Sequence, residues 1–316
     1  MFPSAKTASA YTRLFAKKDI LFTTAISLIY LLLSKILIGY KTDQLVLVFI
    51  FNALFYASFP TRKFITGFSV FIIFWVLFDS MKAFPNYLYN TVHIESLYTA
   101  EKNLFGIHFQ NHIITPNEYW RLHTTTFFDL ISGIFYLCWV PVPIIFAMYL
   151  FFSNRREQFM HFSLTFLFVN IIGFIIYYIY PAAPPWYVQH YGYQFIAHTP
   201  GNTAGLQRFD DFFHAGIFNA LYAKSSNVFA AMPSLHSAYP LITLYYGIKN
   251  RLGLINILFA VIMFGIWFAA IYSSHHYVLD VLAGISCAVA GIFIFQRWIA
   301  PNAKFKALII DKFVNG

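Results

Sequence analysis

The fold is decided by the stretch LINILFAVIMFGIWFAAIYSSHHYVLDVLAGISCAVAGIFIF, residues 254–295. Two apolar runs, Leu254–Tyr272 and Tyr277–Phe295, flank a short polar break that contains two adjacent histidines. A transmembrane helix needs about 20 predominantly apolar residues, and each run has nearly that length. The stretch therefore predicts two membrane-spanning helices that are joined by a polar turn.

The same pattern recurs along the chain and predicts an all-α, polytopic membrane bundle of about eight transmembrane helices. Hydrophobic residues make up 59% of the 316 and charged residues only 10%, with a mean hydropathy of +0.62. Soluble domains average about 25% charged residues, so this chain has too few charged residues to cover a water-exposed surface. The other six predicted spans are Asp19–Tyr40, Gln44–Pro60, Phe64–Met81, Phe127–Phe152, Phe162–Tyr180 and Met232–Ile248.

Lysine and arginine alternate between the loops, and this pattern predicts that both termini lie in the cytoplasm. Each loop on the side of the N-terminus carries at least two basic residues, and these loops are short. The first run follows a basic flank that includes Lys6 and Lys17, and it lacks a signal-cleavage site, so it is predicted to be a span. The net charge of +9 then reflects topology and anionic lipid, and no nucleic-acid partner is expected.

Three regions are expected, with no linker or repeat between them. Residues 1–126 would hold the first three spans and an outer segment, residues 127–296 the catalytic bundle, and residues 297–316 a cytoplasmic tail. The boundaries follow the predicted spans and do not depend on any motif.

Two long segments, residues 82–126 and 181–231, connect spans on the predicted outer side. Long ordered loops in a compact protein are usually functional. Within the first long segment, Ile94–Phe105 and Asn117–His123 are predicted to be amphipathic helices at the membrane interface. The chemistry is therefore expected at this end of the bundle.

Two short polar stretches stand at the predicted outer starts of spans: AMPSLHS, residues 231–237, and YSSHHYVLD, residues 272–280. His276 and Asp280 are four residues apart, which places them on one face of a helix, whereas His275 would point about 100° away. The Asp280 carboxylate could fix the tautomer of His276 and leave the other ring nitrogen free as a nucleophile.

Each stretch taken alone also fits an ordinary helix start. An aspartate near a helix N-terminus is favoured by the helix dipole, and a proline and a serine commonly open a helix. Two such stretches at the same membrane face are harder to explain by capping. An ionisable residue at a span is costly to bury, and this favours a catalytic role.

The sequence resembles a known family at these positions. Pro233–His236 (PSLH) and His276–Asp280 (HYVLD) are similar to the second and third signature blocks of the type 2 phosphatidic acid phosphatase superfamily. More narrowly, the chain resembles the inositol phosphorylceramide synthase branch from about Asp129 to Phe295. The blocks that carry this narrower resemblance are YPAAPPW (180–186), AGLQRFD (204–210), AMPSLHS (231–237) and HHYVLD (275–280).

The resemblance implies a role for each matching residue. His276 would attack phosphorus, Asp280 would orient it, and His236 would act as general acid and base. The first block of the phosphatases is absent, and Ala270 stands where their third block has an arginine. These phosphate clamps are missing, and this favours the synthase-like branch.

Other residues are predicted to bind the substrate. Arg208 is the main candidate for a phosphate clamp because a guanidinium matches phosphate oxygens in a bidentate fork, and Lys224 is the second. Asp129 would bind headgroup hydroxyls or would pair with a cation. The remaining substrate-binding candidates are Asp210, Ser234 and Trp186.

No metal site and no cofactor are expected. His108 and His112 have metal-like spacing, but no third ligand follows at a typical distance, so they are interpreted as interfacial. The donor implied by the resemblance is already a phosphodiester, so no nucleotide or redox cofactor is needed.

The resemblance implies a membrane phosphotransferase with lipid partners. It would move phosphoinositol, or a related phospho-headgroup, from a phosphatidylinositol-like glycerophospholipid to a ceramide-like acceptor through a histidine-linked intermediate. One alternative is a lipid phosphate phosphatase with water as the acceptor. A transporter is the other, and the position of the charges at span ends disfavours it. The site is expected on the non-cytoplasmic face, either of a bacterial inner membrane or of a Golgi membrane.

Overall fold

The protein is described by a computed structural model that covers residues 13–223 and 227–315. Helices form nearly all of the regular structure in this part of the chain, and two short strands make one hairpin. The predicted all-α, polytopic class is therefore confirmed. Lys6 and Lys224 lie outside the described residues.

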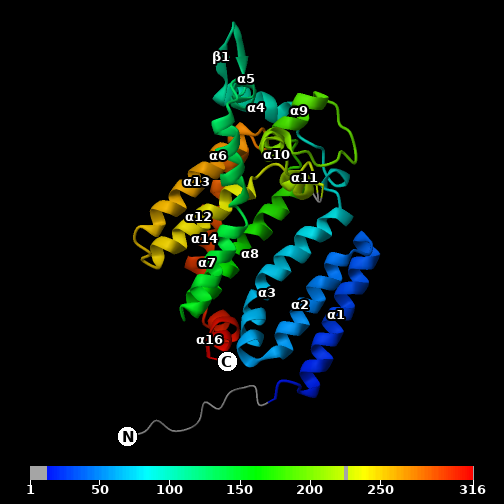
Figure 1. Cartoon of the computed structure of the whole chain (residues 1–316), viewed down its shortest axis with the longest axis vertical. Coiled ribbons are helices and arrows are strands. Elements are labelled where there is room, and N and C mark those ends of the chain that lie inside the picture. The colour runs from blue at the N-terminus through cyan, green and yellow to red at the C-terminus, as the bar shows by residue number, and fades with distance from the viewer. Residues whose placement is uncertain (1–12, 224–226, 316) are drawn as a thin grey trace.

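The first three helices lie together along one side of the molecule (Figure 1). They are α1 (Lys17–Ile38), α2 (Thr42–Ala57) and α3 (Phe59–Ser80). α3 begins where the Ser58 hydroxyl accepts a hydrogen bond from the Thr61 amide at 3.2 Å, an ordinary N-cap. Arg62 is buried and pairs with Asp19 at 2.9 Å, and its guanidinium lies 4.2 Å over the Phe55 ring. This ion pair fastens the start of α1 to α3.

The first long segment folds at one end of the bundle (Figure 1). Its elements are α4 (Glu95–Phe105), β1 (Ile107–Phe109), β2 (His112–Ile114) and α5 (Pro116–Leu122). α5 starts with a reciprocal cap, in which Thr115 accepts from the Glu118 amide and Glu118 accepts from the Thr115 amide at 2.7 Å. The two predicted helices of this segment are thus confirmed to within one residue at each end.

The predicted fourth span is not one continuous helix. It consists of α6 (Thr126–Leu137) and α7 (Pro141–Phe152), which are bent by 40° at residues 138–140. Pro141 occupies the first turn of α7, where its missing N–H is tolerated, but its ring prevents a straight continuation of α6. The predicted span from Phe127 to Phe152 is therefore bent, and the break places Trp139 between its two helices.

Four further helices complete the bundle: α8 (Arg156–Ile179), α12 (Leu235–Lys249), α13 (Ile255–Tyr272) and α14 (Val278–Ile294). α8 contributes Phe159, Phe162 and Phe166 to the core, with the three- and four-residue spacing of an inward-facing helix stripe. Gly173 of α8 lets Leu235 approach, because a Cβ there would lie 2.6 Å from the leucine side chain. The start of α12 is thereby packed tightly against α8.

The second long segment contains α9 (Pro185–Tyr191), α10 (Gln207–Phe213) and α11 (Ile217–Tyr222). It lies at the same end of the bundle as the first long segment (Figure 1). The His93 amide of the first segment donates to the Pro181 carbonyl at 2.8 Å, so the backbone connects the two. The short helices α15 (Ala303–Phe305) and α16 (Lys312–Asn315) follow α14 at the opposite end.

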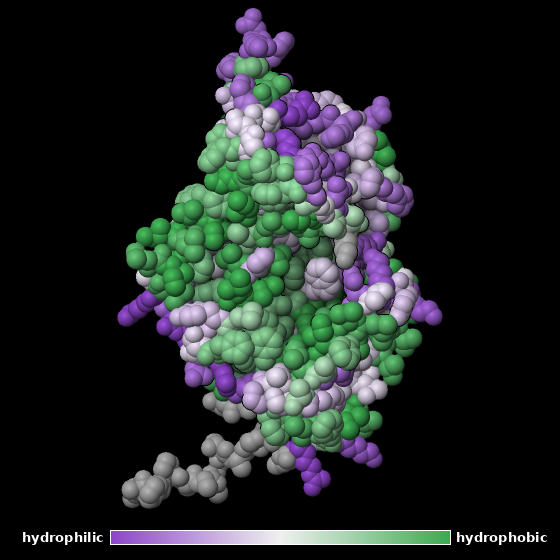
Figure 2. Space-filling model, in the orientation of Figure 1, coloured by the Kyte–Doolittle hydropathy of each residue, from purple (hydrophilic) through white to green (hydrophobic). Residues whose placement is uncertain are grey.

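Within the part of the chain that the structure describes, five helices are long and apolar enough to cross a membrane: α1, α3, α8, α13 and α14. The bent pair of α6 and α7 makes a possible sixth. α2 has 16 residues and α12 has 15, with Pro240 inside α12. At 1.5 Å per residue, both are shorter than a bilayer core of about 30 Å. Hydrophobic side chains cover α12 and α13 in Figure 2, and hydrophilic ones gather near α9. The protein is an integral membrane protein; the count of eight and the orientation stay predictions.

Candidate active site

The two histidines of the third block lie in the turn between α13 and α14. The amides of His275 and His276 both donate to the Ala270 carbonyl, each at 3.0 Å, and this closes the end of α13. α14 begins only at Val278, so neither histidine is helical. The expectation of a helix through His275 is wrong, and the side chains are arranged by the turn.

His276 nevertheless faces Asp280, as the four-residue spacing predicted. Its Nδ1 lies 3.6 Å from Oδ2 of Asp280, which is fully buried. The Asp280 Oδ2 atom accepts a hydrogen bond from the Tyr277 amide at 2.8 Å, so the carboxylate also fixes the turn. A separation of 3.6 Å is too long for a hydrogen bond, but catalytic contacts often shorten only when substrate binds.

The other ring nitrogen of His276 faces the second block. Its Nε2 lies 3.1 Å from Nδ1 of His236, which stands in the first turn of α12. The three residues therefore form a continuous row, with Asp280 on one side of the His276 ring and His236 on the other. The nitrogen that is opposite the carboxylate is the one that can attack phosphorus, because Asp280 would hold the proton on Nδ1.

Burial lowers the pKa of His276 to about 4, so the ring is neutral near pH 7. A neutral ring has a lone pair on one nitrogen, which a nucleophile requires. Half-buried His236 is the more accessible of the two histidines. The arrangement thus pairs an enclosed, neutral histidine with a more accessible one.

The contact between the second and third blocks depends on the backbone. The Ser234 amide donates to the Asp280 carbonyl at 2.8 Å. Gly284, one turn further along α14, faces the Ser234 carbonyl, and a Cβ at this glycine would lie 2.0 Å from that oxygen. Only glycine permits so close an approach, and this approach brings His236 to His276.

His275 has a different environment from its neighbour. One of its ring nitrogens lies 2.9 Å from the Thr203 carbonyl, to which it donates, and its ring stacks on Tyr222 at 4.4 Å between centroids. Burial, together with the adjacent His276, lowers the pKa of His275 to about 3. His275 is therefore a neutral residue that ties the turn to the second long segment.

Arg208, the predicted phosphate clamp, is paired with Asp129. Its Nε donates to Oδ1 of Asp129 at 2.5 Å, and the Tyr272 hydroxyl donates to the same oxygen at 2.8 Å. The Nη2 atom of Arg208 is buried without a hydrogen-bond partner among the described residues. The preceding Gly205 donates its amide to the Ser273 carbonyl at 2.9 Å, and this places the arginine beside the histidine turn.

The other predicted substrate-binding residues occupy different positions around the site. Asp210 accepts hydrogen bonds from the amides of Phe218 and Asn219 at 3.2 and 3.0 Å, so both of its oxygens serve the start of α11. Trp186 is buried, and its amide donates to the Ser274 carbonyl at 3.0 Å. Ser234 supports the histidine pair through its backbone. Lys224 is outside the described residues.

Two aromatic residues of the bent span contact His236, although no motif in the sequence marks them. The Tyr136 hydroxyl lies 3.3 Å from Nδ1 of His236, and the Trp139 ring packs edge to face on the His236 ring at 4.5 Å. Tyr136 follows Asp129 by seven residues, which is two helical turns, so a helical projection from Asp129 could have indicated it. Trp139 could not be found that way because it lies in the break.

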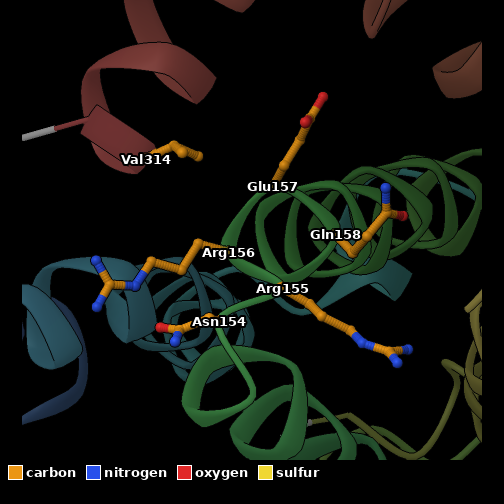
Figure 3. A pocket seen from close by; sticks show the side chains of 6 residues that line it. All are labelled: Asn154, Arg155, Arg156, Glu157, Gln158 and Val314. Atoms are coloured by element: carbon orange, nitrogen blue, oxygen red, sulfur yellow. The ribbon is translucent and has the colours of Figure 1, made fainter. Parts of the chain in front are cut away.

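A hollow lies at the end of the bundle opposite the histidines. It is lined by residues 154–158 and Val314, at the start of α8, where Arg155 and Arg156 point away from each other (Figure 3). Leu235, the neighbour of His236, packs on Gly173 of α8. Gly173 lies about 25 Å along α8 from Arg156, at 1.5 Å per residue. The hollow is therefore remote from the histidines.

His108 and His112 are exposed on the hairpin β1–β2. Within residues 13–223 and 227–315, no group of three or more histidine, cysteine or acidic side chains is arranged to hold a metal ion.

Comparison with known proteins gives the same class as the site. Residues 106–294 match the family model of the PAP2 superfamily. The chain is 47% identical over 292 residues to the phosphoinositol dihydroceramide synthase of Bacteroides thetaiotaomicron, which covers 92% of this chain and 96% of that protein. It is 28% identical over 256 residues to the catalytic subunit of inositol phosphorylceramide synthase of Saccharomyces cerevisiae, covering 78% and 61%. No solved structure matches significantly.

This chain thus belongs to the PAP2 superfamily. Within the superfamily it is an inositol phosphorylceramide synthase-like phosphotransferase, as its sequence blocks predicted.

Proposed function

We propose that the protein transfers phosphoinositol from a phosphatidylinositol-like donor to a ceramide-like acceptor. The names of the two relatives support this choice of substrates. The observation that carries the chemistry is the row Asp280–His276–His236, with separations of 3.6 and 3.1 Å. In this row a nucleophile is oriented from one side and faces a proton carrier on the other.

The first displacement would form a covalent intermediate. Nε2 of His276 attacks phosphorus, and the bond from phosphorus to the diacylglycerol oxygen breaks. For this step His236 must carry a proton, which the anionic phosphate of the bound donor would favour, and it gives that proton to the departing oxygen. The Asp280 carboxylate stabilises the positive charge that develops on the phosphorylated ring of His276, because it lies beside Nδ1.

The second displacement would reverse the proton movement. Neutral His236 takes the proton of the ceramide hydroxyl, whose oxygen attacks phosphorus, and the bond to His276 breaks. Both histidines then have their starting protonation states, so the cycle closes without a cofactor. General acid–base help of this kind contributes about 10²–10⁴-fold in rate.

Arg208 is the best candidate for binding the phosphate. Its partner-free Nη2 can donate to a phosphate oxygen while Nε stays on Asp129. The proposed location of the site is the non-cytoplasmic face of a bacterial inner membrane. The catalytic region would be residues 127–296, supported by the family match over residues 106–294.

The test is a product analysis with purified protein. Ceramide and inositol-labelled phosphatidylinositol are supplied in mixed micelles, and lipids are separated by thin-layer chromatography and identified by mass. We expect phosphoinositol-ceramide and diacylglycerol in equal amounts. Release of free inositol phosphate as the main product would instead show that water is the acceptor, and no turnover of the labelled lipid would refute the proposed transfer.

The matched variants are His276→Ala and the double variant His236→Ala/His276→Ala. The single variant should abolish product, and the double variant should be barely worse, because residues that act as a unit are not additive.

A further inference from the structure

The first long segment touches the nucleophile turn through a buried carboxylate. Glu101, on α4, is fully buried. Its two oxygens accept hydrogen bonds from the first amides of α14: Oε1 from Val278 at 2.9 Å and Oε2 from Leu279 at 3.1 Å. The first amides of a helix have no partner within it, and a carboxylate there is favoured by the helix dipole. Glu101 therefore caps α14 from a distant part of the chain.

A second residue of the same segment holds the other side of the turn. Asn117, on α5, is also fully buried. Its Nδ2 donates to the Ile271 carbonyl at 2.8 Å and to the His276 carbonyl at 2.9 Å. One side-chain amide thus connects the end of α13 to the backbone of the nucleophile itself.

Together with Asp280, these residues leave the turn little freedom. Asn117 fixes the His276 carbonyl, Asp280 fixes the next amide, and Glu101 fixes the two amides after that. The distance between His276 and His236 is then set by groups that surround the turn on both sides.

We propose that Glu101 and Asn117 are positioning residues that hold the His276 turn in its reactive geometry. This inference rests on the proposed function, in which His276 is the nucleophile. Neither residue touches His236 in the described contacts, so both would act through the backbone of the turn. A misplacement of about 1 Å can cost about 10²-fold in rate, which makes such support kinetically important.

The ionisation of Glu101 provides a readout that packing alone would not give. Burial, with a contribution from the nearby Asp280, raises the pKa of Glu101 to about 7. The titratable groups around it are Asp280 and Tyr277 of the turn, with Tyr98 and Glu118 from α4 and α5 close by. A protonated Glu101 accepts more weakly, so the turn should loosen as the pH falls through about 7.

The experiment compares Glu101→Gln and Asn117→Ala with two controls on exposed positions of α4, Glu95→Gln and Asn103→Ala. Each variant is purified at full length, and kcat and KM for phosphoinositol transfer are measured from pH 5.5 to 8.5. We expect kcat to fall about 10²-fold in both test variants with KM within about threefold, and the controls to match the wild type. The wild-type loss of kcat near pH 7 should be absent in Glu101→Gln.

Amide hydrogen exchange of the peptide covering residues 271–280 gives a readout that does not depend on the reaction. Exchange at Val278 and Leu279 should accelerate in Glu101→Gln and stay at the wild-type rate in Glu95→Gln. Unchanged exchange in Glu101→Gln, or wild-type kcat with an unaltered pH profile, would overturn the positioning role. If the wild type transferred no phosphoinositol but the exchange changed as expected, the proposed function would fail and the support of the turn would stand.

Discussion

Gly284 lies against the main-chain oxygen of Ser234 so closely that a methyl group there would sit 2.0 Å from it. This contact joins the start of α12, which carries His236, to α14, whose first turn carries Asp280. The distance between the two histidines thus depends on the absence of one side chain.

Gly284→Ala should therefore damage the reaction more than the fold. The added methyl must push α12 away from α14 and move His236 from its 3.1 Å contact with His276. We expect kcat to fall by about 10²-fold. The measurement is transfer kinetics beside the midpoint of thermal unfolding. Gly216→Ala is the matched control, because a Cβ there meets no atom within 4 Å. Equal kinetics in the two variants would show that the close contact is unimportant.

Arg208→Lys should impair turnover although it keeps the charge. A lysine cannot hold Asp129 and a phosphate oxygen at once in the fixed geometry of a guanidinium. We expect a loss of about 10-fold or more in kcat/KM, measured against phosphatidylinositol concentration. Asp129→Asn tests the pair from the other side, and the double variant should lose less than the sum of the two single effects because the residues are in contact. Full additivity would mean that the ion pair has no part in binding.

Acid should destabilise the protein through its buried neutral histidines. The pKa of His275 is about 3 in the folded protein and about 6.5 when unfolded, so the unfolded chain binds more protons between these values. This contribution to stability is complete above pH 6.5 and is lost as the pH falls toward 3. In His275→Phe the unfolding midpoint should move upward relative to the wild type as the pH drops from 7 to 4. A constant difference across that range would contradict the sign.

The orientation of the bundle can be tested by cysteine labelling. On a background in which Cys138 and Cys287 are replaced by serine, Asn103→Cys places a thiol on exposed α4 and Ser153→Cys places one at the opposite end. A membrane-impermeant maleimide added to intact cells should label the first and miss the second. The reverse pattern would place the histidine pair on the cytoplasmic face.

Much of the architecture follows from apolar periodicity, but its exceptions have local causes. The bend before Pro141 was not predictable from hydropathy, because prolines are tolerated in membrane helices when neighbours satisfy the freed backbone groups. α14 begins only at Val278 because the Asp280 carboxylate accepts a hydrogen bond from the Tyr277 amide and so caps the helix. The four-residue spacing of His276 and Asp280 instead predicts that both residues lie inside a helix.

The candidate site also contains residues that the sequence could identify and residues that it could not. His236, His276 and Asp280 could be assigned because their motifs are local, and the structure brings them into one row. Glu101 could not be assigned to it, because it lies 177 residues from Val278 in sequence and only the fold brings them together. Trp139 was hidden by the assumption of a continuous span.

The cap supplied by Glu101 also imposes an order on biogenesis. The residue that completes the nucleophile turn is synthesised long before the turn, and its carboxylate must remain solvated until α14 inserts beside it. A nascent chain that already contains α12 and α13 would still lack a fixed His276. On the proposed mechanism, His276 would therefore reach its reactive geometry only when the last span is in place beside α4.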